Sequence, residues 1–185
     1  MHSTNPEIIY QSPETTPAGD PFITVKKARG YYYYSERGGI NSVFFILYDK
    51  STSKYCLINE SKPPLDESRG GLTQLTTAFG GSLDDPSKSP DDIVVIETLE
   101  EAGYIVPAKS VHYVGKSMVS TQSSQVAYGY LVNVTGISKS HKSECDDSSN
   151  SNSLVWLTYS ELLLNSDWKS IFIAAKFKEE LWHQL

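Results

Sequence analysis

Apolar residues recur along this chain mostly in short runs, either alternating with polar residues or continuous, and turn-forming residues separate the runs. Runs of about four to eight such residues are typical of β-strands. We expect strands at 22–27, 31–34, 43–48, 54–58, 72–79, 111–117, 126–134 and 154–157. A turn is expected at 160–165. The first 20 residues hold three prolines among polar residues, which predicts an extended arm.

Two stretches predict helices. The first helix is capped by Ser89, has Pro90 at its first position, and has Asp92 where a capping box requires a carboxylate. Gly103 can adopt the left-handed conformation that ends this helix. The second helix is expected at 168–182, and we interpret its apolar stripe as core packing. That stripe consists of Trp168, Ile171, Phe172, Ala175 and Trp182.

Three glutamates lie near the end of the first predicted helix. Glu100 and Glu101 follow Glu97 by three and four positions, so a helix places all three on one face. A solvated acidic face is the ordinary interpretation, but apolar residues border these carboxylates, which favours acids that point into a cleft. The apolar residues are Ile93, Val94 and Ile96 beside the acids, and Val95, Leu99 and Ala102 opposite them. Carboxylates gathered in a cleft predict Mg²⁺, Mn²⁺ or Ca²⁺.

The segment 97–104, ETLEEAGY, resembles the second half of the Nudix box, G-x5-E-x7-R-E-U-x-E-E-x-G-U with U apolar. Gly80 and Gly81, followed by an acidic loop and Ser-Pro-Asp-Asp, resemble its first half. The departures are Lys88 at the first glutamate, Ile96 at the arginine, Thr98 at an apolar position, and one additional residue after Gly81. The resemblance implies an α/β fold, with a mixed β-sheet sandwiched between α-helices and a strand-rich N-terminal arm.

Within that superfamily, the chain is most similar to the nucleotide-sugar diphosphatases that act on ADP-ribose and UDP-sugars. The similarity rests on segment 57–64, LINESKPP, on the strands before Gly39, and on the polar loop that ends at Gln125. It implies a metal-dependent hydrolase that cleaves the diphosphate of a nucleotide sugar and releases the nucleoside monophosphate. Mg²⁺, or Mn²⁺, is the implied cofactor.

The same resemblance assigns roles to residues of the box. Glu97 and Glu101 are the implied principal metal ligands, assisted by Glu100 and by the backbone carbonyl of Gly80. Glu100 and Glu101 are also the implied catalytic residues. At Gly81, a backbone without a Cβ atom can approach a phosphate closely, so we expect a substrate contact there.

Other site residues are expected outside the box. The general base of the family often comes from a late loop before the last strand, and here the corresponding stretch 150–153 has no carboxylate. A carboxylate elsewhere in the serine-rich stretch 136–153 could fold back into that role. The candidates are Glu144, Asp146 and Asp147. Lys62 and Gln125 are the expected substrate-binding residues of the two polar loops.

Composition limits the classes of function. The chain has 185 residues, of which 39% are hydrophobic and 21% charged, as is typical of a soluble globular protein. Its net charge of −6 argues against a nucleic-acid partner bound through phosphates. The two cysteines, Cys56 and Cys145, form neither a zinc motif nor a disulfide framework. With neither a leader nor a long apolar run, we expect a cytoplasmic protein that binds no membrane.

Two structural units are expected. Residues 1–39 form the N-terminal arm, and residues 40–185 form the Nudix domain. The resemblance implies that the arm helps to form a homodimer, and the tyrosines at 31–34 would supply apolar surface for it.

Two other functions stay open at this point. Lys88 and Ile96 favour a catalytically weak Nudix-like module that binds a nucleotide or a protein. A Nudix hydrolase could also act on nucleoside triphosphates or dinucleoside polyphosphates instead.

Overall fold

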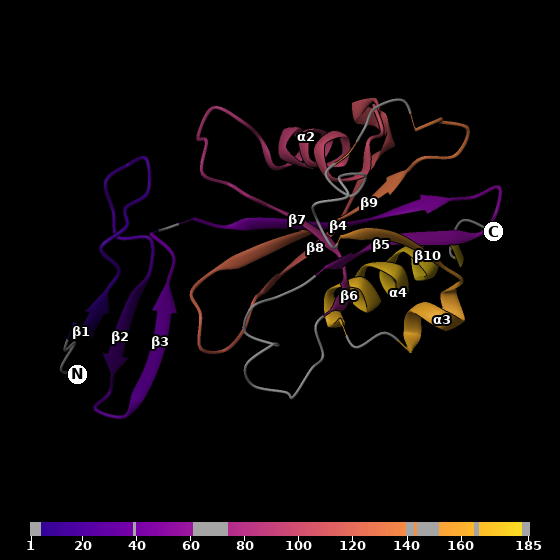
Figure 1. Ribbon diagram of the computed structural model, residues 1–185. Helices are drawn as coiled ribbons and strands as arrows, with labels where there is room; N and C mark the ends of the chain where they lie inside the picture. The colour runs from indigo at the N-terminus through magenta and orange to yellow at the C-terminus, as the bar shows by residue number, and fades with distance from the viewer. Residues whose placement is uncertain are drawn as a thin grey trace.

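The computed structural model describes residues 5–38, 40–60, 74–139, 143, 152–164 and 167–182, with side chains described up to residue 179. Its centre is a seven-stranded sheet of order β10-β5-β4-β9-β8, in which β6 pairs with β5 and β7 pairs with β4 (Figure 1). The strands are β4 (Ser42–Asp49), β5 (Lys54–Glu60), β6 (Leu75–Thr77), β7 (Phe79–Ser82), β8 (Val111–Met118), β9 (Val126–Asn133) and β10 (Ser153–Leu157).

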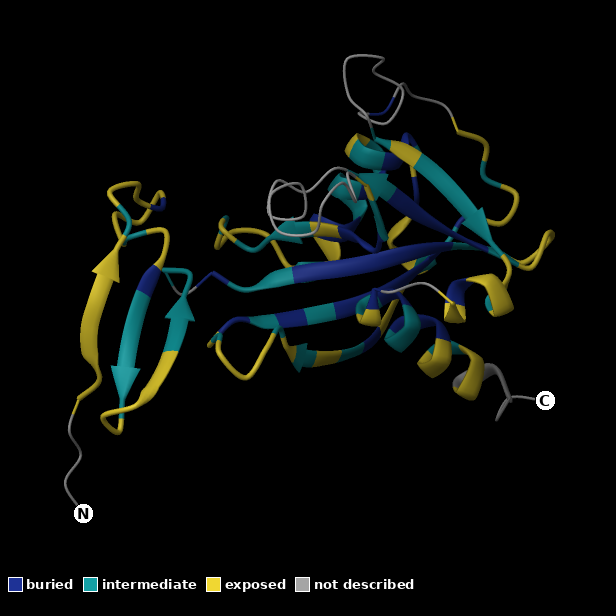
Figure 2. Cartoon of the chain, turned by 60° about the horizontal axis from the view of Figure 1, so that its bottom comes forward, coloured by how far each residue is buried: buried dark blue, intermediate teal, exposed yellow. Residues whose placement is uncertain are grey.

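The sheet is mixed because two central strands run parallel. β4 pairs with β9 in parallel, with Val43 opposite Tyr128, whereas the other pairings in this sheet are antiparallel. Residues 43–47 of β4 are all apolar and all buried, as Figure 2 shows for the centre of the molecule. A continuous apolar run is what a strand covered on both faces requires.

Helices cover both faces of the sheet. They are α2 (Pro90–Ala102), α3 (Tyr159–Leu163) and α4 (Trp168–Trp182), with a 3-10 turn η1 (Ala108–Ser110) after α2. On one face Val43 and Phe45 pack with α2, and on the other Phe44 and Ile46 pack with α3 and α4. Successive residues of β4 therefore fill two separate cores. The predicted α/β architecture is confirmed. No helix within the described ranges is both long and apolar enough to cross a membrane.

The N-terminal segment forms a second, three-stranded antiparallel sheet beside the main one (Figure 1). Its strands are β1 (Glu7–Gln11), β2 (Thr24–Ala28) and β3 (Tyr32–Glu36). The sequence predicted strands at β2 and β3, whereas at β1 it predicted an extended arm and no strand. Every residue of β1 is exposed, so its apolar residues have no buried face whose period could reveal a strand.

Three details of the secondary structure after residue 70 differ from the sequence-based expectation. Thr158 and Glu161 form a capping box that starts α3 where a turn was expected. The strand expected at 72–79 is interrupted at Ala78, between β6 and β7. The apolar stripe of α4 was also partly wrong, because Ile173 and Ala174 are buried whereas Ala175 is exposed.

Candidate active site

The helix that carries the acidic residues has both of its ends fixed by local hydrogen bonds. The amide of Asp92 donates to Ser89 Oγ at 3.2 Å, and the Asp92 carboxylate accepts from the Ser89 amide at 2.9 Å. Hydrogen bonds from Ser89 hold the pKa of the Asp92 carboxyl below its ordinary value. At the other end, Gly103 has a φ of 78° and its amide donates to the Leu99 carbonyl at 2.9 Å. These caps set where α2 begins and ends, as the sequence predicted.

Close packing between α2 and β7 places one glutamate directly against the double glycine. A Cβ atom added at Gly81 would lie 2.6 Å from Glu97 Oε1 and 2.8 Å from Ile93 Cγ2, so any other residue there would force these side chains to move. Behind this contact Thr98 is fully buried, and its hydroxyl donates to the Val94 carbonyl at 2.6 Å. That hydrogen bond explains how a polar residue occupies the apolar position of the box.

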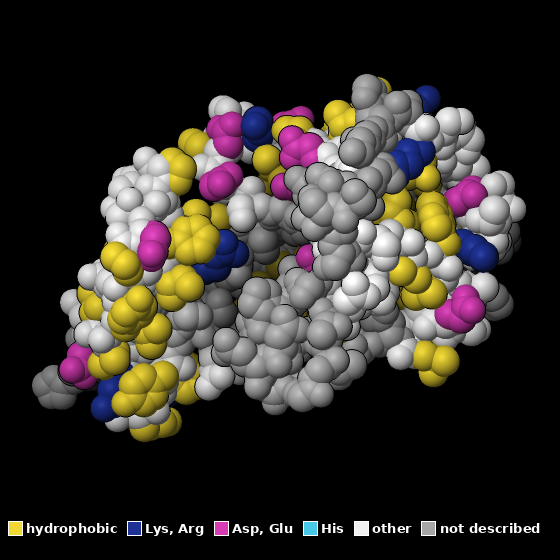
Figure 3. All heavy atoms as spheres, in the orientation of Figure 1, with side chains coloured by type: hydrophobic (Ala, Val, Ile, Leu, Met, Phe, Trp, Pro, Cys, Tyr) yellow, Lys and Arg dark blue, Asp and Glu magenta, His cyan; other side chains and the backbone are white. Residues whose placement is uncertain are grey.

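A cavity of about 490 Å³ lies beside this contact. Gly80 and Gly81 of β7, Glu101 of α2, and Gln125 just before β9 all line it. Val43 and Phe44 also line it, and they belong to opposite cores, so the cavity spans the end of the sheet. Figure 3 shows the surface hollowed between the N-terminal sheet and the main body.

Cationic side chains share this cavity with the carboxylates. Arg37, which links β3 to β4, lines the cavity, and its guanidinium carbon lies 4.8 Å from the centre of the Phe22 ring. Among the described residues, Arg37 Nε is buried with no hydrogen-bond partner. Lys169 of α4 lies in the same wall. A guanidinium group with an unused N–H donor suits an anionic ligand such as a phosphate.

A buried aspartate ties the start of α4 to the strand that carries the double glycine. The Asp167 carboxylate accepts hydrogen bonds from the Ala78 amide at 3.0 Å and from Ser170 Oγ at 2.6 Å. Burial alone would raise the pKa of Asp167, but these hydrogen bonds and the charge of Lys169 outweigh it and leave the pKa below its ordinary value. Asp167 is therefore a charged structural link in the wall of the cavity.

The N-terminal sheet is hydrogen-bonded to the loop that ends at Gln125. The Ser35 amide donates to the Gln122 carbonyl at 2.8 Å, and the Ser124 amide donates to the Ser35 carbonyl at 3.0 Å. The Tyr32 hydroxyl also donates to the Thr121 carbonyl. Gln125 itself is buried. The position of this residue in the cavity thus depends on the N-terminal sheet.

The donor set fits a hard divalent cation. Glu97 and Glu101 are one helical turn apart and supply carboxylate oxygens, and the tight contact at Gly81 holds the first of them against β7. In the described part of the chain, no three His, Cys, Asp or Glu side chains gather closely enough to hold a metal by themselves. A backbone oxygen, such as the predicted carbonyl of Gly80, would therefore have to complete the protein's share of ligands.

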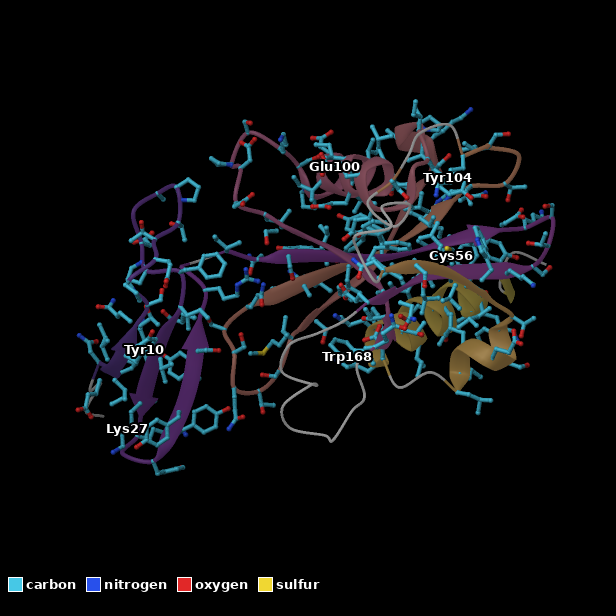
Figure 4. The ribbon with its side chains drawn as sticks, in the orientation of Figure 1. Tyr10, Lys27, Cys56, Glu100, Tyr104 and Trp168 are labelled. Carbon is cyan, nitrogen blue, oxygen red and sulfur yellow. The ribbon has the colours of Figure 1, made fainter. Side chains whose placement is uncertain are left out.

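The predicted site residues fall into three groups. The cavity brings together Gly80, Gly81, Glu101 and Gln125, with Glu97 beside them. Glu100 is exposed on α2 and is not among the residues that line the cavity, so its role stays a prediction (Figure 4). Lys62, Glu144, Asp146 and Asp147 lie outside the described residues, and their roles also stay predictions.

Sequence reasoning missed the other charged and aromatic residues of the cavity. They are Arg37, Glu60, Asp167, Trp168 and Lys169. Glu60 stands inside the segment LINESKPP, for which the sequence predicts a substrate contact only at Lys62. The expected stripe of α4 assigned Trp168 to the core, although Asp167 and Ser170 around it form a helix cap that the sequence could have signalled.

Comparison with known proteins gives a structural match without a sequence match. No protein-family model matches the chain. No curated protein matches it either. A solved structure described as an ADP compounds hydrolase superimposes with a TM-score of 0.66 at 14% sequence identity. The match covers 100% of this chain and 98% of that one. The two chains share their fold.

That match supports the fold class predicted from the box. The chain shares its mixed α/β architecture with that structure, and the likeness extends over the N-terminal sheet because it covers the whole chain. At this identity the likeness concerns the fold alone.

Proposed function

We propose that this protein is a metal-dependent hydrolase that cleaves the diphosphate of ADP-ribose, or of a UDP- or ADP-sugar, and releases the nucleoside monophosphate. The observation that carries the proposal is the composition of one cavity. It combines the acids of α2 and the double glycine with the cations Arg37 and Lys169. The likeness to a hydrolase of ADP compounds supports the same substrate class.

Different residues of this chain would bind the metal ion and the phosphates of the substrate. Glu97 and Glu101 would hold Mg²⁺ or Mn²⁺, with Gly80 contributing its carbonyl. A bound divalent cation supplies positive charge that offsets the charge of the diphosphate and activates water for attack. Gly81 leaves space for the Glu97 carboxylate beside the backbone, and that backbone would contact the phosphates. Arg37 would stabilise the charge of the leaving phosphate.

Two sources of a general base fit this proposal. Glu60, the last residue of β5, is a carboxylate in the cavity wall. Glu144, Asp146 and Asp147 of the serine-rich stretch are the alternatives expected from the sequence. Either source would take the proton of the attacking water.

The N-terminal sheet is the proposed homodimer interface. Ile8, Ile9 and Tyr10 of β1, and Tyr31, Tyr32 and Tyr33 on the other edge, are exposed on this small sheet. One chain leaves this apolar surface uncovered, whereas a second copy would bury it.

A substrate panel tests the proposal. ADP-ribose, UDP-glucose, ADP-glucose, diadenosine polyphosphates and dGTP would be incubated with the protein, with and without Mg²⁺, and nucleoside monophosphate would be measured. We expect Mg²⁺-dependent release from ADP-ribose or a nucleotide sugar. Release from dGTP or the diadenosine compounds alone would favour the polyphosphate hydrolase. No release from any compound would favour the nucleotide- or protein-binding module.

A further inference from the structure

A tryptophan is exposed inside the candidate active-site cavity. Trp168 is the first residue of α4 and lines the cavity with 43% of its surface exposed. The centre of its ring lies 6.0 Å from that of Phe44, at an interplanar angle of 57°. Phe44 itself is buried in the core beneath α4. The indole therefore packs against the core and still leaves aromatic surface open.

The residues around Trp168 hold the indole in place. Asp167, immediately before it, is anchored to Ala78 and Ser170, so the backbone at the start of α4 is fixed. One turn further on, Phe172 also contacts the Phe44 ring, with 6.3 Å between the ring centres. A rigid aromatic surface loses little conformational freedom when a ligand packs on it.

The cavity offers different chemistry at its two ends. Figure 4 places Trp168 at the start of α4 and Glu100 on α2, on opposite faces of the sheet. Glu101 and Gly81, which suit a metal and a diphosphate, line the cavity from α2 and β7, whereas Lys169 and the indole line it from α4. The indole suits a flat apolar ring. A nucleotide has both parts, and its base can stack on any aromatic face.

We propose that Trp168 is the platform on which the nucleobase of the substrate stacks. This inference rests on the proposed function and assigns the base of its substrate to the start of α4. Trp168 is then a specificity-determining residue, because it favours compounds that carry a base over compounds that carry none. Stacking requires no particular hydrogen-bonding pattern, so the platform can hold different bases.

A fluorescence titration tests the contact without any turnover. AMP and ribose 5-phosphate, which differ by the base, would be added to the full-length protein without metal. We expect AMP to quench tryptophan fluorescence and ribose 5-phosphate to leave it unchanged. Trp168→Phe should abolish the quenching. The control Trp156→Phe, which alters a partly buried tryptophan in another cavity, should retain it. Quenching that persists in Trp168→Phe would overturn the proposal.

Kinetics separate the contact from a structural role. Trp168→Leu keeps an apolar contact with Phe44 and should raise KM for ADP-ribose by about 5- to 100-fold, the range expected for loss of one base–aromatic stack. We expect kcat to change less than about 3-fold, and Trp168→Phe to recover most of the loss. An unchanged KM in Trp168→Leu would contradict the proposal while leaving hydrolysis intact. Quenching by AMP at Trp168 without hydrolysis of any diphosphate would contradict the proposed function and support this inference.

Discussion

At the scale of single residues, Gly81 is the position where the proposed metal site depends most directly on backbone geometry. We expect Gly81→Ala to displace the Glu97 carboxylate, since the new Cβ atom would lie 2.6 Å from its Oε1. A displacement of this kind should lower kcat/KM for ADP-ribose by about 100-fold. Gly80→Ala is the comparison variant, because its Cβ would meet only the Val43 carbonyl at 3.6 Å and the backbone carbonyl assigned to the metal is kept, so we expect a smaller loss. Equal activity of the two variants would show that the contact has no role in the site.

A second residue-scale prediction concerns the general base. Glu60→Gln is expected to lower kcat at least ~100-fold with little change in KM, because a base acts on water and not on substrate binding. Deletion of 138–149 should leave kcat within about 3-fold if Glu60 is the base. The reverse result, full activity in Glu60→Gln and loss in the deletion, would assign the base to Glu144, Asp146 or Asp147.

At the scale of elements, strongly patterned segments were predictable and exposed or polar ones were not. The capping box and the C-terminal glycine specified α2 within the sequence itself, and the apolar run of β4 specified a strand covered on both faces. β1 has no buried face, so periodicity gave no signal. The cavity wall at α4 depends on the approach of Asp167 to Ala78, which are 89 positions apart in sequence.

The link between α4 and the box strand gives a pH-dependent prediction. The pKa of Asp167 is lowered in the folded protein, so its contribution to stability is present above its unfolded pKa of about 4 and is lost as pH falls through the folded value. Asp167→Asn should reduce the free energy of unfolding at pH 7 by about 2 kcal/mol, or Tm by about 4–8 °C.

Melting curves at pH 7 and at about pH 3 would check this difference. The gap between Asp167→Asn and the wild type should shrink at the lower pH as Asp167 itself becomes protonated. Asp20→Asn, at an exposed position of the loop between β1 and β2, should leave Tm unchanged at both pH values. A gap of the same size at both pH values would show that the charge of Asp167 contributes nothing.

At the scale of the whole molecule, the order of strands and helices apart from β1 and α3 could be read from the sequence, whereas the assembly of the cavity could not. The box placed Gly81 and the α2 acids near one another because they are close in sequence. Arg37, Glu60 and Lys169 join them only through the pairing of β4, β5 and β7 and the docking of α4. Such long-range contacts leave no periodic pattern in the chain.

The exposed apolar surface of the N-terminal sheet belongs to this scale as well. We expect light scattering at micromolar concentration to give a mass twice the 20.6 kDa of one chain. The double substitution Ile8→Glu and Tyr10→Glu should give the monomer mass, because it places charges in the proposed interface. Ile105→Glu, an equally exposed apolar residue after α2, is the control and should stay dimeric. A wild-type mass equal to that of one chain would contradict the proposed dimer.

The measurement that tests the central claim most directly is release of AMP from ADP-ribose in Mg²⁺ by Glu101→Gln. This substitution keeps the shape of the side chain and removes one carboxylate of the cavity. The proposed site predicts release by the wild type and a loss of about 100-fold or more in Glu101→Gln. Glu179→Gln, at an exposed glutamate of α4, should match the wild type. Equal release by all three proteins would contradict the assignment of the active site to the acids of α2.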